Sequence, residues 1–154
     1  MASRVTGLIV VLVATAGFAT GDQPLAPQMI VDARYVSDPE PALLFDVRAR
    51  AAHAVFEADL PWGNFYSVRL TFRNAAGKEL CPLLAHPIDD PSDEVVNLTL
   101  GQVLGGRVAL LPRCPALLAL GAHGPVTVEW AYTPVVHKLE GEPIHGRVTM
   151  PSPK

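Results

Sequence analysis

Two cysteines are the residues of this sequence with the clearest chemistry. Cys81 and Cys114 are its only cysteines, and each is followed directly by proline. Redox-active pairs usually have the spacing Cys-X-X-Cys, and thiolate metal sites need more ligands than two. An exported chain with an even number of cysteines most often pairs them. The sequence therefore predicts a structural disulfide between Cys81 and Cys114.

Four carboxylates form an acidic loop that could hold a cation. Asp89, Asp90, Asp93 and Glu94 fall within six residues, and calcium prefers about six to eight oxygen ligands. The loop lacks the alternating pattern of an EF-hand, and charge runs usually face water. The five histidines show neither H-x-x-x-H nor H-E-x-x-H spacing. We therefore expect a solvated loop and no cofactor, with a metal site at these carboxylates as the alternative.

The densest aromatic cluster is a candidate for partner binding. Trp62 lies in a predicted turn over 61–64, and Phe65 and Tyr66 follow it directly at the start of an expected strand. Tryptophan and tyrosine dominate the binding energy of protein interfaces, so aromatic side chains on a turn can anchor a partner. The alternative is that Trp62 covers one end of the core, because an indole buries a large apolar area wherever it can.

No motif of a catalytic or nucleotide site accompanies these candidates. The sequence contains neither G-x-S-x-G nor S-x-x-K, and its glycine-rich stretch near 101–106 lacks the Lys-Ser/Thr of a phosphate loop. The net charge is −3, and the basic residues are scattered without a run of three. A nucleic-acid site needs a concentrated basic surface. The sequence thus predicts a protein that is not an enzyme and does not bind nucleic acid.

The first residues have the pattern of a targeting segment. Arg4 precedes an apolar run, and small residues follow at positions 14–19. This order of a basic, an apolar and a small-residue region is typical of a secretory signal peptide. The apolar stretch is shorter than the about 20 residues that span a membrane, although a short anchor is the alternative. We expect a signal peptide over 1–19, a linker over 20–28, and a periplasmic or secreted protein with no membrane span after cleavage.

The rest of the chain alternates short apolar segments with turns rich in proline and glycine. A two-residue period of apolar and polar side chains predicts strands. One domain over 29–137 is expected, followed by a proline-rich tail over 138–154 that has little to bury and could lie on a partner or add an edge strand. The segment 54–60 fits a strand or a short helix, and 116–120 fits one helical turn. The other expected strands are 29–36, 42–51, 65–73, 78–84, 95–100, 107–111, 125–134 and 144–150.

One stretch carries a family resemblance. A glycine turn at Gly101 leads into a short strand, a helical corner follows at 115–120, and a strand led by Gly124 ends in the aromatic Trp130. Residues 100–132 thereby resemble the last third of bacterial immunoglobulin-like domains. The resemblance implies an all-β, antiparallel immunoglobulin-like β-sandwich of about seven to nine short strands. Antibody-type Cys–Trp–Cys spacing is absent, and such folds host many functions, so no activity is implied.

Together these features favour a non-enzymatic exported domain that binds another protein. It could serve as an accessory subunit of an envelope or secreted assembly. One alternative is a small-ligand or metal-binding module that uses the histidines and the acidic loop. A second alternative is a protease inhibitor, in which the exposed loop 81–93 blocks an active cleft.

Overall fold

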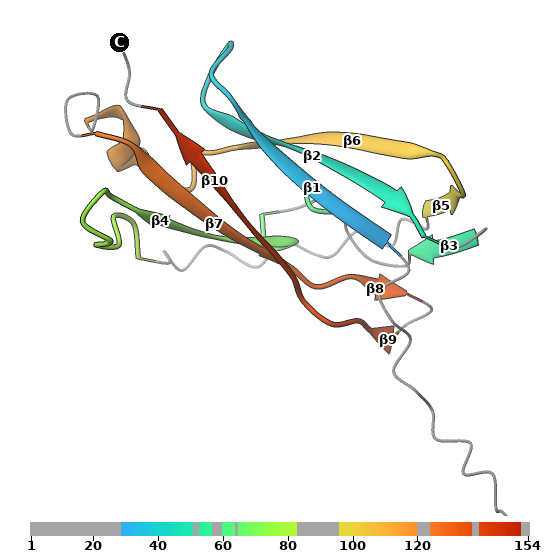
Figure 1. Ribbon diagram of the computed structural model, residues 1–154. Helices are drawn as coiled ribbons and strands as arrows, with labels where there is room; N and C mark the ends of the chain where they lie inside the picture. Colours follow the sequence, from blue (N-terminus) through green and yellow to red (C-terminus); the bar gives the residue numbers. More distant parts are fainter. Residues whose placement is uncertain are drawn as a thin grey trace, which may run out of the picture.

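The chain folds into antiparallel β-structure, with two three-stranded sheets that share one apolar core (Figure 1). The computed structural model describes residues 29–50, 53–56, 60–63, 65–82, 96–119, 124–136 and 139–151. The predicted signal peptide and linker, residues 1–28, lie outside this part. No helix among the described residues is long and apolar enough to cross a membrane. The all-β prediction is confirmed.

The first sheet has the order β1-β2-β6. Strands β1 (Met29–Val36) and β2 (Ala42–Ala49) form an antiparallel hairpin in which each of the eight residues of β1 pairs with a residue of β2. β2 also pairs with β6 (Val103–Ala109), which begins four residues earlier than predicted. Gly105 and Gly106, which fall between the expected strands 95–100 and 107–111, lie inside β6 opposite Asp46 and Phe45.

The second sheet has the order β10-β7-β4. Strand β7 (Val126–Tyr132) is central and alternates buried and half-buried residues along its whole length, as its sequence period predicts. It pairs on one side with β4 (Val68–Arg73) and on the other with β10 (Ile144–Met150). The strand predicted over 144–150 is confirmed. The idea that the tail has little to bury is wrong for these residues, because Met150 is buried and all seven positions pair with β7.

Aromatic side chains join the two sheets across the core. The Phe45 ring of β2 meets the Trp130 ring of β7 edge to face, with 5.3 Å between ring centroids. Trp130 in turn covers Gly146 of β10, its direct partner in the sheet. β1 and β10 lie side by side where the sheets approach each other (Figure 1). Burial of such large apolar side chains, about 1.5–3 kcal/mol each, is the main force that holds the sheets together.

A smaller sheet extends one end of the molecule, in the order β5-β3-β8-β9. It contains β3 (His53–Phe56), β5 (Val96–Thr99), β8 (Val135–Val136) and β9 (Leu139–Glu140). For 53–56 the strand alternative is therefore correct. β8 and β9 were not predicted, because two residues are too few for a sequence period.

Two predicted strands are shorter than expected. The segment 65–73 becomes a strand only at Val68, and residues 65–67 form part of a turn. The predicted strand 78–84 is reduced, in its described residues, to a single bridge between Arg73 and Glu79. The structure has a tight turn over residues 74–77, between the two predicted strands. The Asn74 side chain accepts hydrogen bonds from two backbone amides, and Gly77 has a φ of 78°.

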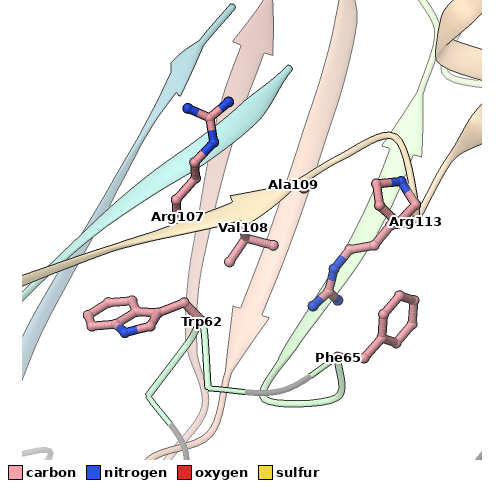
Figure 2. Close-up of a pocket in the computed structure, with 7 residues that line it drawn as sticks. Trp62, Phe65, Arg107, Val108, Ala109 and Arg113 are labelled. Carbon is pink, nitrogen blue, oxygen red and sulfur yellow. The ribbon is translucent and has the colours of Figure 1, made fainter. Parts of the chain in front are cut away.

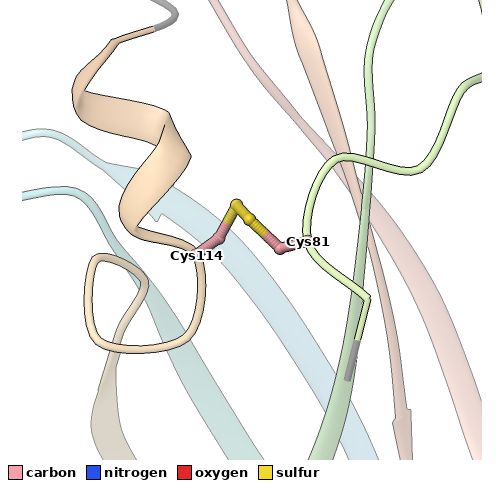
Figure 3. The surroundings of a disulfide bond; sticks show 2 residues. All are labelled: Cys81 and Cys114. Atoms are coloured by element: carbon pink, nitrogen blue, oxygen red, sulfur yellow. A yellow bond between two sulfur atoms is a disulfide. The ribbon is translucent and has the colours of Figure 1, made fainter. Parts of the chain in front are cut away.

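The chain leaves the bridge toward a disulfide that ties the ends of the two sheets together. Cys81 is bonded to Cys114, with 5.4 Å between the two Cα atoms (Figure 3). Cys114 immediately precedes the 3-10 helix η1 (Pro115–Leu118), close to the predicted helical turn. The predicted pairing is confirmed, and a disulfide is typical of proteins in oxidising compartments.

Candidate functional site

A shallow cavity of about 280 Å³ lies between β6 and the turn that precedes β4 (Figure 2). We call this cavity the aromatic hollow. Trp62 and Phe65 form the side away from β2, and Val108 and Ala109 of β6 form the opposite side. The remaining lining comes from Arg107, Pro112 and Arg113. Residues from two stretches of the chain that are far apart in the sequence therefore meet here.

Trp62 is held in place by the absence of a side chain on β6. A Cβ atom at position 106 would overlap the Trp62 indole, so Gly106 leaves the space that the ring occupies. The turn is closed by a hydrogen bond from the Gly63 amide to the Leu60 carbonyl, at 2.7 Å. Trp62 is half-buried and packs against the core. One part of the indole thus anchors the turn, and another part lines the hollow.

Arg113 supplies a positive charge inside the hollow. Its Nη1 atom donates a hydrogen bond of 3.0 Å to the Val68 carbonyl, and its guanidinium carbon lies 4.3 Å from the Phe65 ring centroid. This distance fits a cation–π contact. Burial lowers the pKa of Arg113 to about 10, because desolvation disfavours the charged form. The guanidinium therefore stays protonated at neutral pH, next to the aromatic wall.

Arg107 lines the hollow but directs its charge elsewhere. Its two terminal nitrogens donate hydrogen bonds to the carbonyls of Asp38 and Glu40, at 3.1 and 2.6 Å. Figure 2 shows its guanidinium on the other side of β6 from Trp62. Arg107 therefore fastens the β1–β2 turn to β6, and Arg113 is the cation within the hollow.

The predicted aromatic cluster is divided by the structure. Trp62 and Phe65 come together in the hollow, and Tyr66 does not line it. The Tyr66 ring instead meets Phe65 edge to face at 5.5 Å and remains 45% exposed. The sequence analysis missed Arg113 and the β6 residues, because no local motif marks them. The available signal was the Gly105-Gly106 pair, which falls between two of the strands that the sequence predicts.

The other predicted binding-site residues fall outside the part of the chain that the structure describes. Asp89, Asp90, Asp93 and Glu94 lie outside the described residues, as does most of the loop 81–93 of the inhibitor hypothesis. Within the described segments, no group of three or more histidine, cysteine or acidic side chains could hold a metal ion. His145 is exposed on the outer face of β10.

The chemistry of the hollow suits recognition. Aromatic rings and an arginine are the side chains that contribute most binding energy at protein interfaces. The volume of about 280 Å³ lies at the lower end of small-molecule pockets, which usually measure about 300–1,000 Å³. A side chain from a partner protein would fill such a space. Comparison of the chain with protein-family models, curated proteins and solved structures gives no match, so the site is argued from geometry alone.

Proposed function

We propose that this protein is an exported, non-enzymatic binding module that takes a segment of a partner protein into the aromatic hollow. The proposed fold is an immunoglobulin-like β-sandwich, and the proposed location is the periplasm or the extracellular space. By binding this partner, the chain would serve as an accessory subunit of an envelope or secreted assembly.

Export is supported by two independent features of the chain. Residues 1–19 have the order of a secretory signal, and the Cys81–Cys114 disulfide is typical of an oxidising compartment. The sandwich is supported by two antiparallel sheets whose inward side chains form one core. Strands β6 and β7, joined by a short helical corner, follow the order on which the immunoglobulin-like resemblance rests.

The observation that carries the binding proposal is the meeting of Trp62, Phe65 and Arg113 around one cavity. Trp62 is fixed by Gly106, and Arg113 is fixed by its bond to the Val68 carbonyl. Side chains held in this way lose little conformational entropy when a partner binds. A partner segment with an apolar side chain and an adjacent acceptor fits this combination of rings and guanidinium.

Site-specific photo-crosslinking tests the proposal in cells that produce the protein. A photoreactive phenylalanine replaces Tyr66, which is exposed and packs against Phe65 beside the hollow. The control position is Leu118, which is 75% exposed and does not line the hollow. We expect an adduct from position 66 that is absent from position 118 and is lost when Trp62→Ala is added.

The crosslinked protein is then identified and purified for a direct measurement. We expect Trp62→Ala to raise the Kd by about tenfold or more, in the range of interface hot spots. Equal adducts from both positions, or a Kd that Trp62→Ala leaves unchanged, would refute binding through the hollow.

A further inference from the structure

The outer face of the β10-β7-β4 sheet gathers cations that are far apart in the sequence. The register aligns Arg69 of β4 with Ala131 and then with His145 of β10. In the next row, Glu129 of β7 is followed by Arg147 of β10, and Arg73 lies one row further on β4. Threonines fill most of the remaining positions. We call this surface the arginine face.

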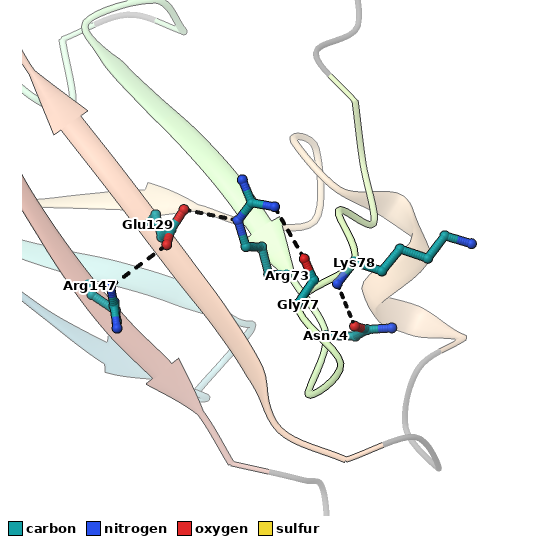
Figure 4. Close-up of polar contacts among 6 residues, drawn as sticks. All are labelled: Arg73, Asn74, Gly77, Lys78, Glu129 and Arg147. Atoms are coloured by element: carbon teal, nitrogen blue, oxygen red, sulfur yellow. Dashed lines mark hydrogen bonds and ion pairs between the residues drawn. The ribbon is translucent and has the colours of Figure 1, made fainter.

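Two carboxylates of the described residues stand among these cations: Glu129 and the exposed Glu79, which lies opposite Arg73 in the bridge beside β4. Glu129 contacts Arg73 at 3.1 Å and Arg147 at 4.0 Å (Figure 4). Arg69 and His145 are exposed and have no hydrogen bond or ion pair with any described residue. Arg73 and Arg147 therefore share Glu129, and Arg69 has no acidic partner among the described residues. Across the described positions of this face, three arginines stand against two carboxylates.

The strands of the β1-β2-β6 sheet also carry three arginines and two carboxylates on their outer face, but each of these arginines has an acceptor. Arg34 pairs with Asp46 at 2.9 Å, and Arg48 pairs with Asp32 at 3.4 Å. The Arg107 guanidinium donates to the carbonyls of Asp38 and Glu40. On the arginine face Arg69 has no such acceptor among the described residues, and Arg147 reaches Glu129 only at 4.0 Å, so these two guanidinium groups are available to an anion from outside.

The composition of the arginine face restricts the class of anion. The exposed large apolar side chains of the described chain lie elsewhere. A protein interface needs aromatic or apolar anchors at its centre, and stable membrane attachment needs inserted apolar groups besides basic ones. Single-stranded nucleic acid is held by stacking on aromatic rings, which this face does not offer. A hydrophilic chain that bears repeated anionic groups needs neither apolar anchors nor aromatic rings on the protein. It can bind to cations and hydroxyls alone.

We propose that the arginine face binds a linear acidic polysaccharide. Carboxylate or sulfate groups along the sugar chain would pair with the guanidinium groups of Arg69, Arg73 and Arg147. The threonine hydroxyls would bond to sugar hydroxyls between them. Adjacent strands are spaced about 4.8 Å apart, so cations on β4 and β10 stand about 10 Å apart across the sheet. One extended chain can cross all three strands. This binding site is separate from the aromatic hollow.

Titration of the purified protein with two polyanions tests the inference. Heparin supplies sulfates, polygalacturonate supplies carboxylates, and dextran is the neutral control. We expect both polyanions to bind, more weakly at about 200 mM than at about 50 mM salt, because binding displaces counterions. The double variant Arg69→Gln/Arg147→Gln should raise the Kd by about tenfold and lower the salt slope by on the order of one to two.

Two further variants separate the arginine face from a general charge effect. Arg34→Gln/Arg48→Gln removes the same charge from the other sheet and should change the Kd by less than about twofold. Glu129→Gln removes the carboxylate that Arg73 and Arg147 contact and should tighten binding by about threefold, which loss of structure cannot imitate. Trp62→Ala should leave the polysaccharide Kd unchanged, so that failure of the hollow and failure of this site are distinguishable.

Several results would overturn the inference. One is the absence of saturable binding to either polyanion at about 50 mM salt. Another is an equal loss of affinity in the two double-arginine variants. Binding that is tighter to vesicles of acidic phospholipid or to duplex DNA, with the same dependence on Arg69 and Arg147, would assign the face to another polyanion.

Discussion

The two tryptophans of this protein use the same local arrangement for different ends. Trp130 covers Gly146, and Trp62 covers Gly106, and in both places a Cβ on the glycine would overlap the indole. Trp130 is 5% exposed because the Phe45 ring of the facing sheet meets it. Trp62 is only half-buried, since beside it lies the aromatic hollow. A tryptophan over a strand glycine is therefore core where a second sheet covers it and a binding surface where none does.

The largest effect should come from removing the covered tryptophan. Trp130→Ala leaves a cavity between the two sheets and removes the ring contact with Phe45, so it should lower the free energy of unfolding by about 3–5 kcal/mol. Chemical denaturation followed by circular dichroism measures this. A loss below about 1 kcal/mol would mean that the sheets are not joined through this contact.

Substitution of the glycine beneath Trp130 should cost more stability than substitution of the glycine beneath Trp62. Gly146→Ala should cost about 1–3 kcal/mol, because Trp130 is enclosed and cannot move away from the new methyl group. Gly106→Ala should cost less, because the half-buried Trp62 can swing toward solvent. Gly105→Ala is the matched control in the same strand, since its nearest contact would be an ordinary 3.4 Å from Asp46. Equal melting temperatures for Gly146→Ala and Gly105→Ala would contradict this account.

Removal of the open tryptophan should cost less stability and more binding. Trp62→Ala deletes a ring that is buried only in part, so we expect a loss of about 1–2 kcal/mol in the free energy of unfolding. The partner captured through position 66 should nevertheless be lost. A loss of stability as large as that of Trp130→Ala would show that Trp62 belongs to the core and would remove the basis of the binding proposal.

The smallest effect on stability is expected at Arg113. Arg113→Met replaces a partly buried cation by a side chain of similar length, and the lost hydrogen bond to Val68 is offset by easier desolvation. We expect a change within about 1 kcal/mol at neutral pH. Partner binding should weaken, because the hollow loses its charge.

The pH dependence of this variant has a definite sign. Burial lowers the pKa of Arg113 to about 10 in the folded protein, below its ordinary value in the unfolded chain, so the unfolded state holds the proton more tightly. The wild type should therefore gain stability relative to Arg113→Met as the pH rises through about 10, and the difference should be flat near neutrality. Denaturation midpoints measured at several pH values check this, and a difference that shrinks above pH 10 would contradict the assignment.

The strands that the sequence predicts well are those with an unbroken period of two. Residues 126–132 alternate apolar and polar types along β7, and the structure buries the apolar set. The hairpin turn after Arg73 was also predictable, because Asn74 and Gly77 are suited to the turn that they form. The disulfide followed from the presence of only two cysteines in a chain whose first residues have the pattern of a secretory signal.

Other features depend on contacts that no local pattern encodes. β6 continues through Gly105-Gly106 because β2 pairs with it and the Trp62 indole occupies the space beside Gly106, and both partners are distant in sequence. The partner of β10 could not be inferred either, since strand pairing is set by long-range packing. The arginine face arises from that pairing, because it aligns Arg69 with His145 across β7.

The sequence by itself determined the all-β class, the disulfide and the two aromatic residues that enter the aromatic hollow. These follow from residue type and short-range period, which local sterics and solvation translate directly into strands and turns. Only the tertiary structure decided which tryptophan is core, that Arg113 joins Trp62 and Phe65, and that three arginines share one face. Each of these depends on which strands become neighbours, and that choice is made by burial summed over the whole chain.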